Sequence, residues 1–382
     1  MTARRDLGAV ATLFAANGLS MGVFGATLPG QQERLELSRG EISGILVSAA
    51  LFAVVSMNLS GRFADRRGAR LLTLLGGVAM AVASVTMGAA PTYQAALVGA
   101  ALFGVGNGAM DVSMNALGVS VEQSRGRPVM SRLHACFSIG SFAGALVVVV
   151  IGTALATAST TRWSLWVGAL ALGLLLVAIR GSTPQSPAAE GAGTAGGGIP
   201  SIAWLLAAMA VCFGLTEGTA IDWSSLHVTE VGRVGPSTGA IGLACVAGFM
   251  VVVRLAGDAV VERLGRALVV RIGAAVALVG YLLTALTSDL VAILPGWCLV
   301  GLGVGLVAPQ IYGLAGHVGG GRGLAAVVSF GYAAFLVGPA LIGFVAARST
   351  LQHAMLVPVV TAVGLVVMSQ WLPSRTAAET PA

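Results

Sequence analysis

Charged residues are scarce in this sequence: Asp, Glu, Lys and Arg together make up 9% of 382 residues, against roughly a quarter in soluble globular proteins. So few charges cannot cover a water-facing surface of this size. Hydrophobic residues make up 56%, glycine adds 54 positions, and the mean hydropathy is +0.91. This exceeds what one water-facing core could bury. The composition therefore excludes a soluble protein and predicts an integral membrane protein in contact with the lipid bilayer.

Lysine is absent, so the net charge of +6 comes from arginines, which occur in short clusters between apolar runs. This distribution is typical of membrane topology signals, and we expect no nucleic-acid partner. Cysteine is also rare. The four cysteines lie inside apolar runs without metal-ligand or C-x-x-C spacing, namely Cys136, Cys212, Cys245 and Cys298. We interpret them as packing residues and expect neither a metal site nor a cofactor.

Apolar runs of about 20 residues, the length that a helix needs to cross a bilayer, recur along the chain. Lipid offers no partner to unpaired backbone groups, so such spans must be helices, and their lack of alternating polarity argues against a barrel. The fold class is therefore all-α, with twelve transmembrane helices. The predicted spans are 7–29, 41–60, 70–90, 93–120, 131–156, 163–180, 200–228, 238–257, 267–287, 290–316, 323–347 and 352–372.

Segment 181–199 is rich in Pro, Gly, Ser and Ala and has the composition of a linker. It divides the spans six and six, which predicts a bundle in 1–180, a cytoplasmic linker in 181–199 and a second bundle in 200–382. Arginines in short loops favour the cytoplasmic side. With both termini inside, the outer loops hold only Arg34, Arg39, Arg162, Arg233 and Arg348. The alternative for the first span is a cleaved signal peptide.

An internal repeat relates the two halves. Gly18–Gly22 matches Gly214–Gly218 at a shift of 196, and Gly104–Gly108 matches Gly301–Gly305 at a shift of 197. The second shift also carries Asp65-Arg66-Arg67-Gly68 onto Glu262-Arg263-Leu264-Gly265. The first span thus has a counterpart, which argues against its cleavage. A six-span unit repeated in the same orientation predicts two pseudo-symmetric bundles with a cavity between them near the midplane.

Several motifs resemble a known family. Gly61–Arg70, between the second and third spans, resembles the loop signature of the major facilitator superfamily, and Arg254–Arg266 resembles its degenerate second copy. Three further stretches are similar to the MosC-like and YbjJ-like branch of bacterial inner-membrane permeases, namely Asn107–Asn115, Arg127–His134 and Glu217–Ser224. The resemblance implies a secondary transporter, usually driven by protons, whose cavity is lined by the first, fourth, seventh and tenth spans.

The resemblance also implies a cytoplasmic gate that latches the two bundles together. Its expected members are Gly61, Asp65, Arg66, Gly68, Arg70, Arg254, Asp258 and Arg263. Ion pairs at a loop break and re-form cheaply, as a gate requires. For the arginines alone, the alternative is plain positive-inside topology.

Asp111 lies at the centre of the fourth span, where a carboxylate costs about 2.5–3.5 kcal/mol on insertion scales. Asn107, Asp111 and Asn115 recur at i, i+4 and i+8, so they share one helical stripe. We interpret this stripe as a polar track that lines the cavity. The alternative is interhelical hydrogen bonding within the bundle, beside the close-packing pair Gly104 and Gly108.

Glu217 and Asp222 are the acids of the seventh span, and five residues between them place their side chains about 140° apart on a helix. They should not both point squarely at one ligand. We predict that Glu217, the deeper one, couples transport to protons together with Asp111. Asp222 and Trp223 are candidates for substrate binding, with an interfacial anchor as the alternative.

Uncharged polar residues on other spans complete the candidates. Asn17 and Gln310 lie on spans that line the cavity in the family, and each could bind a polar solute. His134 lies near Glu122 and Arg132, which favours a local network. The G-x-S-x-G string at Gly18–Gly22 is mid-span and lacks the strand-to-helix turn of a nucleophile elbow. The glycine stretches lack a phosphate-binding lysine, so they are packing elements.

The sequence therefore predicts a monomeric, multi-pass transporter of the bacterial inner membrane rather than an enzyme. It would move a small polar solute, sugar-like or amino-sugar-like, by proton-coupled alternating access, because amides and carboxylates suit hydroxyl and amine donors. Proton-driven multidrug efflux is the first alternative, since acids in an apolar cavity also fit lipophilic cations. A membrane receptor or an intramembrane enzyme on a transporter-like scaffold is the second.

Overall fold

The computed structural model describes residues 2–126, 129–155, 159–179 and 200–373, and every regular element in these ranges is helical. The first half contains α1 (Thr2–Leu35), α2 (Arg39–Arg67), α3 (Ala69–Ala89), α4 (Tyr93–Arg125), α5 (Met130–Leu155) and α6 (Thr160–Ile179). The second contains α7 (Ser201–Val231), α8 (Pro236–Gly239), α9 (Ile241–Leu255), α10 (Gly257–Leu264), α11 (Arg266–Leu286), α12 (Leu290–Val304), α13 (Val307–Arg348), α14 (Leu351–Ala354), α15 (Leu356–Met368) and η1 (Ser369–Trp371). Segment 181–199 lies outside the described residues.

Twelve of the described helical stretches are long and apolar enough to cross a membrane, six in each half, which confirms the predicted fold class. Six of these stretches are longer than the predicted spans, because the helix continues beyond the apolar run. The first runs Asp6–Leu35 and the seventh Ser201–Val231. The protein is therefore a multi-pass membrane protein.

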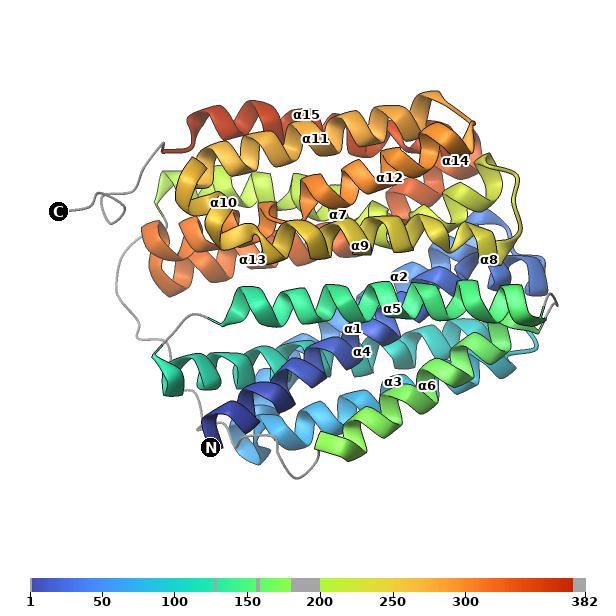
Figure 1. Ribbon diagram of the computed structural model, residues 1–382, viewed down its shortest axis with the longest axis horizontal. Coiled ribbons are helices and arrows are strands. Elements are labelled where there is room, and N and C mark those ends of the chain that lie inside the picture. Colours follow the sequence, from blue (N-terminus) through green and yellow to red (C-terminus); the bar gives the residue numbers. More distant parts are fainter. Residues whose placement is uncertain (1, 127–128, 156–158, 180–199, 374–382) are drawn as a thin grey trace.

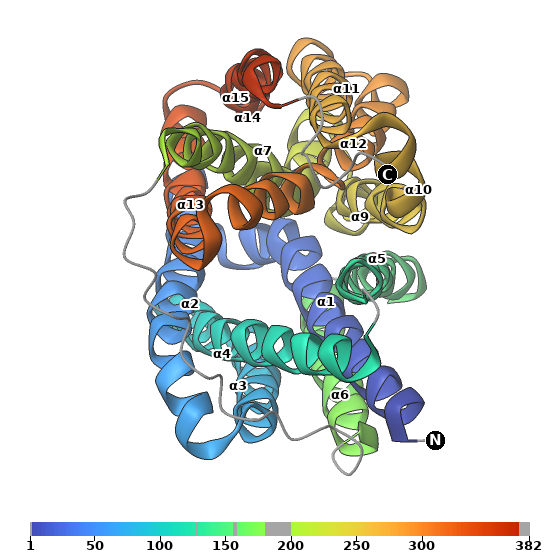
Figure 2. The ribbon, with the colours of Figure 1, turned by 90° about the vertical axis from the view of Figure 1, so that its left-hand side faces the viewer.

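The helices form two bundles that lie side by side (Figure 1), with α1 to α6 in one and α7 to α15 in the other. Figure 2 views the same two bundles along their helices. Helix α1 begins and η1 ends at the same end of the molecule (Figure 1), which we call the terminal end. The opposite end, where α2 begins, is the Arg39 end.

Close contacts between helices at glycine recur at corresponding positions of the two repeats. A side chain at Gly76 would clash with the Gly106 carbonyl oxygen, and residues 197 positions later, Gly273 and Gly303, make the same close approach. Similarly, Gly104 backs onto the carbonyl oxygen of Ala49 and its counterpart Gly301 onto that of Val246. These glycines act as packing elements, as predicted, and the two bundles are built alike.

The turns that join the second to the third span and the eighth to the ninth also correspond. Gly68 ends α2 with a φ of 86°, and Gly265, 197 positions later, ends α10 with a φ of 74°. Both values lie in the region that side chains with a Cβ rarely adopt. Glycine is therefore required at this point of both repeats, whatever else the loop does.

Three predicted spans are irregular. The eighth consists of α8 and α9, the twelfth consists of α14, α15 and η1, and the tenth is interrupted after α12, which ends at Val304. Helical backbone then continues from Val307 through the eleventh span as α13. The two arms of α13 lie side by side, since Tyr312 packs against Gly331. The chain therefore reverses between Val318 and Gly323, where one span ends and the next begins.

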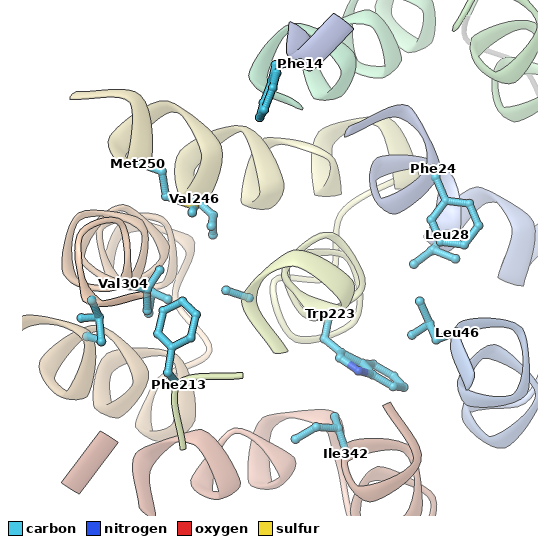
Figure 3. Close-up of a cluster of buried hydrophobic side chains, with 14 of the residues drawn as sticks. Phe14, Phe24, Leu28, Leu46, Phe213, Trp223, Val246, Met250, Val304 and Ile342 are labelled. Atoms are coloured by element: carbon cyan, nitrogen blue, oxygen red, sulfur yellow. The ribbon is translucent and has the colours of Figure 1, made fainter. Parts of the chain in front are cut away.

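The two bundles meet along two seams, one where α5 packs against α9 and one where α2 packs against α13, with α1 also touching α7. Buried apolar side chains fill the second bundle and continue into the first. Figure 3 shows Trp223 of α7 directed toward Ile342 of α13, with Leu46 of α2 nearby. These seams enclose the site described next.

Candidate functional site

A cavity of about 290 Å³ lies between the two bundles. The first half lines it with residues of α1, α2, α4 and α5, and the second half with residues of α7, α9 and the second arm of α13. Most of these residues are apolar. The polar ones are Asn17, Asn107, Asp111, His134, Ser138, Ser141, Glu217, Asp222, Arg254 and Tyr332. The structure thus brings together the predicted substrate and proton residues of α1, α4 and α7 and one predicted gate residue of α9, namely Asn17, Asn107, Asp111, Glu217, Asp222 and Arg254.

Residues of the tenth span are missing from the described lining, although the family resemblance placed that span at the cavity. The second, fifth, eighth and eleventh spans contribute instead. The seams between the bundles run along these four helices, so their side chains reach the space between the bundles directly.

Glu217 forms the only ion pair of the cavity among the described residues. Its Oε1 accepts a hydrogen bond from Nη2 of Arg254 at 3.2 Å, and the two side chains are 10% and 12% exposed. Nε of Arg254 also donates to the carbonyl oxygen of Gly305 at 3.0 Å. A buried charge is tolerated when it is paired and hydrogen-bonded, whereas removal of one partner typically costs about 3–5 kcal/mol. The pair is therefore sensitive to any loss of charge on Glu217.

The position of Arg254 differs from the sequence prediction. Resemblance to the second copy of the loop signature assigned it to the cytoplasmic gate, but its guanidinium lies in the cavity and spans both halves. Its Nη1 donates to Oγ of Ser138, on α5 of the first bundle, at 2.5 Å. Arg254 is the last residue but one of α9, and its side chain contacts the buried Glu217 of α7.

Asp111 also connects the bundles, but through neutral donors. Its Oδ2 accepts a hydrogen bond from the hydroxyl of Tyr332, on α13 of the other bundle, at 3.1 Å. Nδ2 of Asn115 donates to the Asp111 carbonyl oxygen at 2.8 Å and to its Oδ1 at 3.3 Å. The alternative to cavity lining was hydrogen bonding to another helix of the same bundle, whereas among the described residues the interhelical partner of Asp111 lies in the other bundle.

Asp222 lines the same cavity as Glu217, although their spacing suggested that they would diverge. The cavity extends around α7, so both flanks of this helix contribute to its wall. No described residue forms an ion pair or a hydrogen bond with the Asp222 carboxylate. Of the three acids, Asp222 is thus the one whose carboxylate is left for a ligand or water.

Asn17 of α1 contributes a further unsatisfied acceptor. The residue is 1% exposed, its Nδ2 contacts Sδ of Met114 at 3.7 Å, and its Oδ1 is buried without a hydrogen-bond partner among the described residues. A buried amide oxygen without a partner is costly. Its place in the cavity wall provides a way to satisfy it, through a bound solute or water.

Three predicted substrate-binding residues do not reach the described cavity lining. Asn115 lies one turn beyond Asp111 and is engaged by it. Trp223 is 1% exposed and packs in the core (Figure 3), which also argues against an interfacial anchor. Gln310 lies at the start of α13, on the span that does not line the cavity. Direct contact of these side chains with a solute is not supported by this arrangement.

Sequence reasoning missed Tyr332, Ser138 and the cavity position of His134. His134 stacks edge-on against Phe14 at 5.3 Å between ring centroids instead of joining the predicted local network. The carboxylate of Glu122 accepts hydrogen bonds from the backbone of Val129 and Met130. A tyrosine and a serine in an apolar run carry no charge signal, so no sequence pattern singled them out.

The predicted gate residues of the first half lie at the junction of α2 and α3. Arg66 is exposed there, Gly61 and Gly68 lie on either side of it in the sequence, and Arg70 is the second residue of α3. In the second half, Arg263 is exposed on α10. The side chains of Asp65 and Asp258 lie outside the described residues. The gate therefore stays a prediction for all of these residues, and Arg254 in addition lines the cavity.

At the Arg39 end, polar contacts hold the two bundles together. Nε of Arg39, the first residue of α2, pairs with Oε2 of Glu230 near the end of α7 at 2.9 Å, and Gln32 donates to Oε1 of the same carboxylate at 3.3 Å. Oγ of Ser43 donates to the carbonyl oxygen of Pro339 at 2.7 Å. We call these contacts the Arg39 clasp. The sequence indicated only that Arg39 follows an outer loop.

Comparison with known proteins agrees with this architecture. The sequence profile of the Major Facilitator Superfamily matches residues 10–323. The chain is 32% identical over 355 residues to the uncharacterized transporter y4wD of Sinorhizobium fredii, covering 90% of this chain and 92% of that protein. It is 29% identical over 369 residues to the membrane protein MosC of Rhizobium meliloti, covering 94% of this chain and 88% of MosC.

Solved structures share the fold. A mutant form of the nucleoside transporter NupG superimposes with a TM-score of 0.74 at 13% identity, covering 95% of this chain and 98% of that one. A bacterial homologue of the human lysosomal transporter Spinster, in an inward-facing and unoccupied conformation, gives 0.73 at 14% identity and 96% coverage of both. The chain therefore belongs to the Major Facilitator Superfamily, as a transporter similar to its MosC-like members.

Proposed function

We propose that this protein moves a small polar, sugar-like or amino-sugar-like solute across the bacterial inner membrane by proton-coupled alternating access. It works as a monomer with both termini in the cytoplasm, and it needs no cofactor beyond the proton gradient. The observation that carries the proposal is the buried pair of Glu217 and Arg254 in a cavity shared by the two bundles.

Proton coupling requires a group whose protonation changes the forces between the bundles. Protonation of Glu217 would remove the counter-charge of Arg254, and a buried guanidinium without a counter-charge is strongly unfavourable. Arg254 also contacts Ser138 of the opposite bundle. One proton would therefore change a contact that joins the two halves, which is the link that a coupled transporter needs.

Alternating access requires that one end of the cavity is closed while the other is open. The Arg39 clasp joins the bundles at one end through Arg39 and Glu230. With the termini in the cytoplasm, this is the outer end, and the arrangement supports a state closed to the outside. Breaking the clasp and closing the terminal end would expose the same site to the other side.

The cavity wall favours a small solute with hydroxyl or amine groups. The carboxylate of Asp222 and the amide oxygen of Asn17 are acceptors left for such donors. The volume of about 290 Å³ lies at the lower limit of pockets for drug-sized ligands, which span about 300–1,000 Å³. This size supports a small polar solute over the bulky lipophilic cations of multidrug efflux.

A proton-flux assay tests the proposal. The purified protein is reconstituted in proteoliposomes that contain a pH-sensitive dye, and neutral hexoses, amino sugars and tetraphenylphosphonium are added in turn. We expect a sugar or amino sugar to change the internal pH, and protein-free liposomes to remain unchanged. A response to tetraphenylphosphonium alone would favour multidrug efflux. Flux of a sugar without any proton movement would contradict the coupling.

A further inference from the structure

We propose that Ser138 is a positioning residue through which the first bundle responds to the protonation of Glu217. Ser138 is not hydrogen-bonded to the Glu217 carboxylate itself. It acts through Arg254, which donates hydrogen bonds to both residues. The inference rests on the proposed function, because it concerns how the same cavity communicates with the bundle that lacks the ion pair.

Three hydrogen bonds carry the link. Ser138 is 2% exposed, and its Oγ accepts from Nη1 of Arg254 at 2.5 Å while donating to the carbonyl oxygen of His134 at 3.2 Å. The other terminal nitrogen of Arg254, Nη2, donates to Glu217. The series therefore runs from the backbone of α5 in the first bundle, through a guanidinium on α9, to a carboxylate on α7.

The geometry ties the guanidinium to both partners at once. The planar guanidinium presents its donors in a fixed fork, so a shift of Nη2 moves Nη1 as well. When Glu217 is charged, the ion pair holds Arg254 where Nη1 meets Ser138. When Glu217 is neutral, the ion pair no longer holds the guanidinium in place, and the hydrogen bond from Arg254 to Ser138 across the seam of α5 and α9 is weakened. The charged form of Glu217 thus stabilises the present arrangement of the bundles.

Other titratable groups also face this pair. They are Asp111 on α4, His134 on α5, Asp222 on α7, Tyr281 on α11, and Tyr312 and Tyr332 on α13. His134 interacts electrostatically with Arg254, and Tyr281 and Tyr312 with Glu217. Among the described residues only Glu217 forms an ion pair with Arg254. Its protonation is therefore the change that Arg254 transmits most directly to Ser138.

The test measures bundle separation against pH and needs no solute. The four cysteines are replaced by alanine, and spin labels are attached at Gln123→Cys on α4 and Glu262→Cys on α10, two exposed positions near the terminal end. Double electron–electron resonance then gives the distance distribution across a pH series. The parent is compared with Glu217→Gln, Ser138→Ala and Ser138→Thr. Ser131→Ala, an exposed serine on the same helix, is the matched control.

We expect the distances of the parent to shift with pH, and Glu217→Gln and Ser138→Ala to lose this shift. Ser138→Thr keeps a hydroxyl and should retain it, as should Ser131→Ala. If Ser138→Ala responds like the parent while Glu217→Gln does not, the role of Ser138 is overturned and the coupling at Glu217 stands. If Glu217→Gln responds like the parent, Glu217 is not the sensor and both proposals fail. If Ser138→Thr loses the shift along with Ser138→Ala, the hydroxyl is not responsible and the inference is overturned.

Discussion

The three acids of the cavity differ in what they contact, and this difference separates their roles. Glu217 has a cationic partner, Asp111 has neutral donors, and Asp222 has no partner among the described residues. Under the proposed function, Glu217 senses protons through its partner, whereas the unpaired Asp222 is available to a ligand. The same residue type thus serves different functions according to its neighbours.

The placement of Asp222 and its neighbour Trp223 gives a residue-scale prediction. Asp222→Asn should raise the KM for the transported solute by about tenfold, the effect of weakening one charge-assisted hydrogen bond. Trp223→Phe should lower the thermal stability and leave KM unchanged, because the indole packs in the core. Initial rates of uptake in proteoliposomes measure both values. The reverse pattern, with KM altered by the Trp223 change alone, would contradict this placement.

Sequence reasoning located the acids because a carboxylate in an apolar span is costly and therefore conspicuous. It did not locate their partners. Arg254 follows an apolar run and precedes a loop, so its sequence position is equally compatible with a gate. Its pairing with Glu217 depends on how α9 packs beside α7, and the contact of Tyr332 with Asp111 depends on how the bundles meet. Neither contact can be predicted from the residues that are adjacent in the sequence.

At the scale of the helices, glycines decide how closely neighbours approach. Gly144 of α5 faces the backbone of α1, where a Cβ would clash with the carbonyl oxygen of Leu19. A Cβ on Gly173 of α6 would instead meet open space. Both are helical glycines in apolar runs, so the sequence alone does not distinguish a packing glycine from a permissive one.

These two glycines provide matched substitutions. Gly144→Ala should destabilise the protein by about 1–3 kcal/mol, the usual cost of overpacking, because α1 and α5 must move apart. Gly173→Ala should be neutral or stabilise it by up to about 1 kcal/mol, since alanine is the better helix former. Thermal unfolding midpoints in detergent test the pair. Equal midpoints for the two variants would show that the close approach of α1 and α5 is not required.

Helix positions were predictable from hydropathy, but helix breaks were not. The interruption between α12 and α13 falls inside an apolar run that reads as one span. Hydropathy reports how strongly a segment prefers lipid to water. It carries no information on whether the helical backbone is interrupted within that segment. The repeat was more informative, because corresponding glycines such as Gly68 and Gly265 take up the same left-handed conformation in the two halves.

At the scale of the whole molecule, the Arg39 clasp holds one end closed. Arg39 is 36% and Glu230 20% exposed in their side chains, so water weakens the pair. Pairs of this kind contribute about 0.2–1 kcal/mol each. Contacts of this strength favour the form that is closed at the Arg39 end and still break readily. The proposed alternating access requires both properties. The sequence predicted two bundles with a cavity between them, while the state of the two ends follows only from contacts across the seams.

Charge substitution at the clasp tests this reading. Glu230→Arg should populate the form that is open at the Arg39 end, because two arginines then face each other. The double variant Arg39→Glu with Glu230→Arg should restore closure. Fluorescence resonance energy transfer between dyes at Gln94→Cys and Ser288→Cys, both exposed at this end, reports the separation in a cysteine-free background. A double variant as open as the single one would indicate that the ion pair does not hold the bundles.

Proton coupling through Glu217 is tested by a comparison of two modes of transport in Glu217→Gln. With a solute identified by the dye assay, the native protein should accumulate it against a gradient when a pH difference is imposed. The variant should lose this accumulation and retain exchange of labelled for unlabelled solute, because the cavity remains while the proton site is gone. Asp289→Asn, which changes an exposed acid outside the cavity and keeps a side-chain oxygen to cap α12, should behave like the native protein. Undiminished pH-driven accumulation by Glu217→Gln would contradict the central claim.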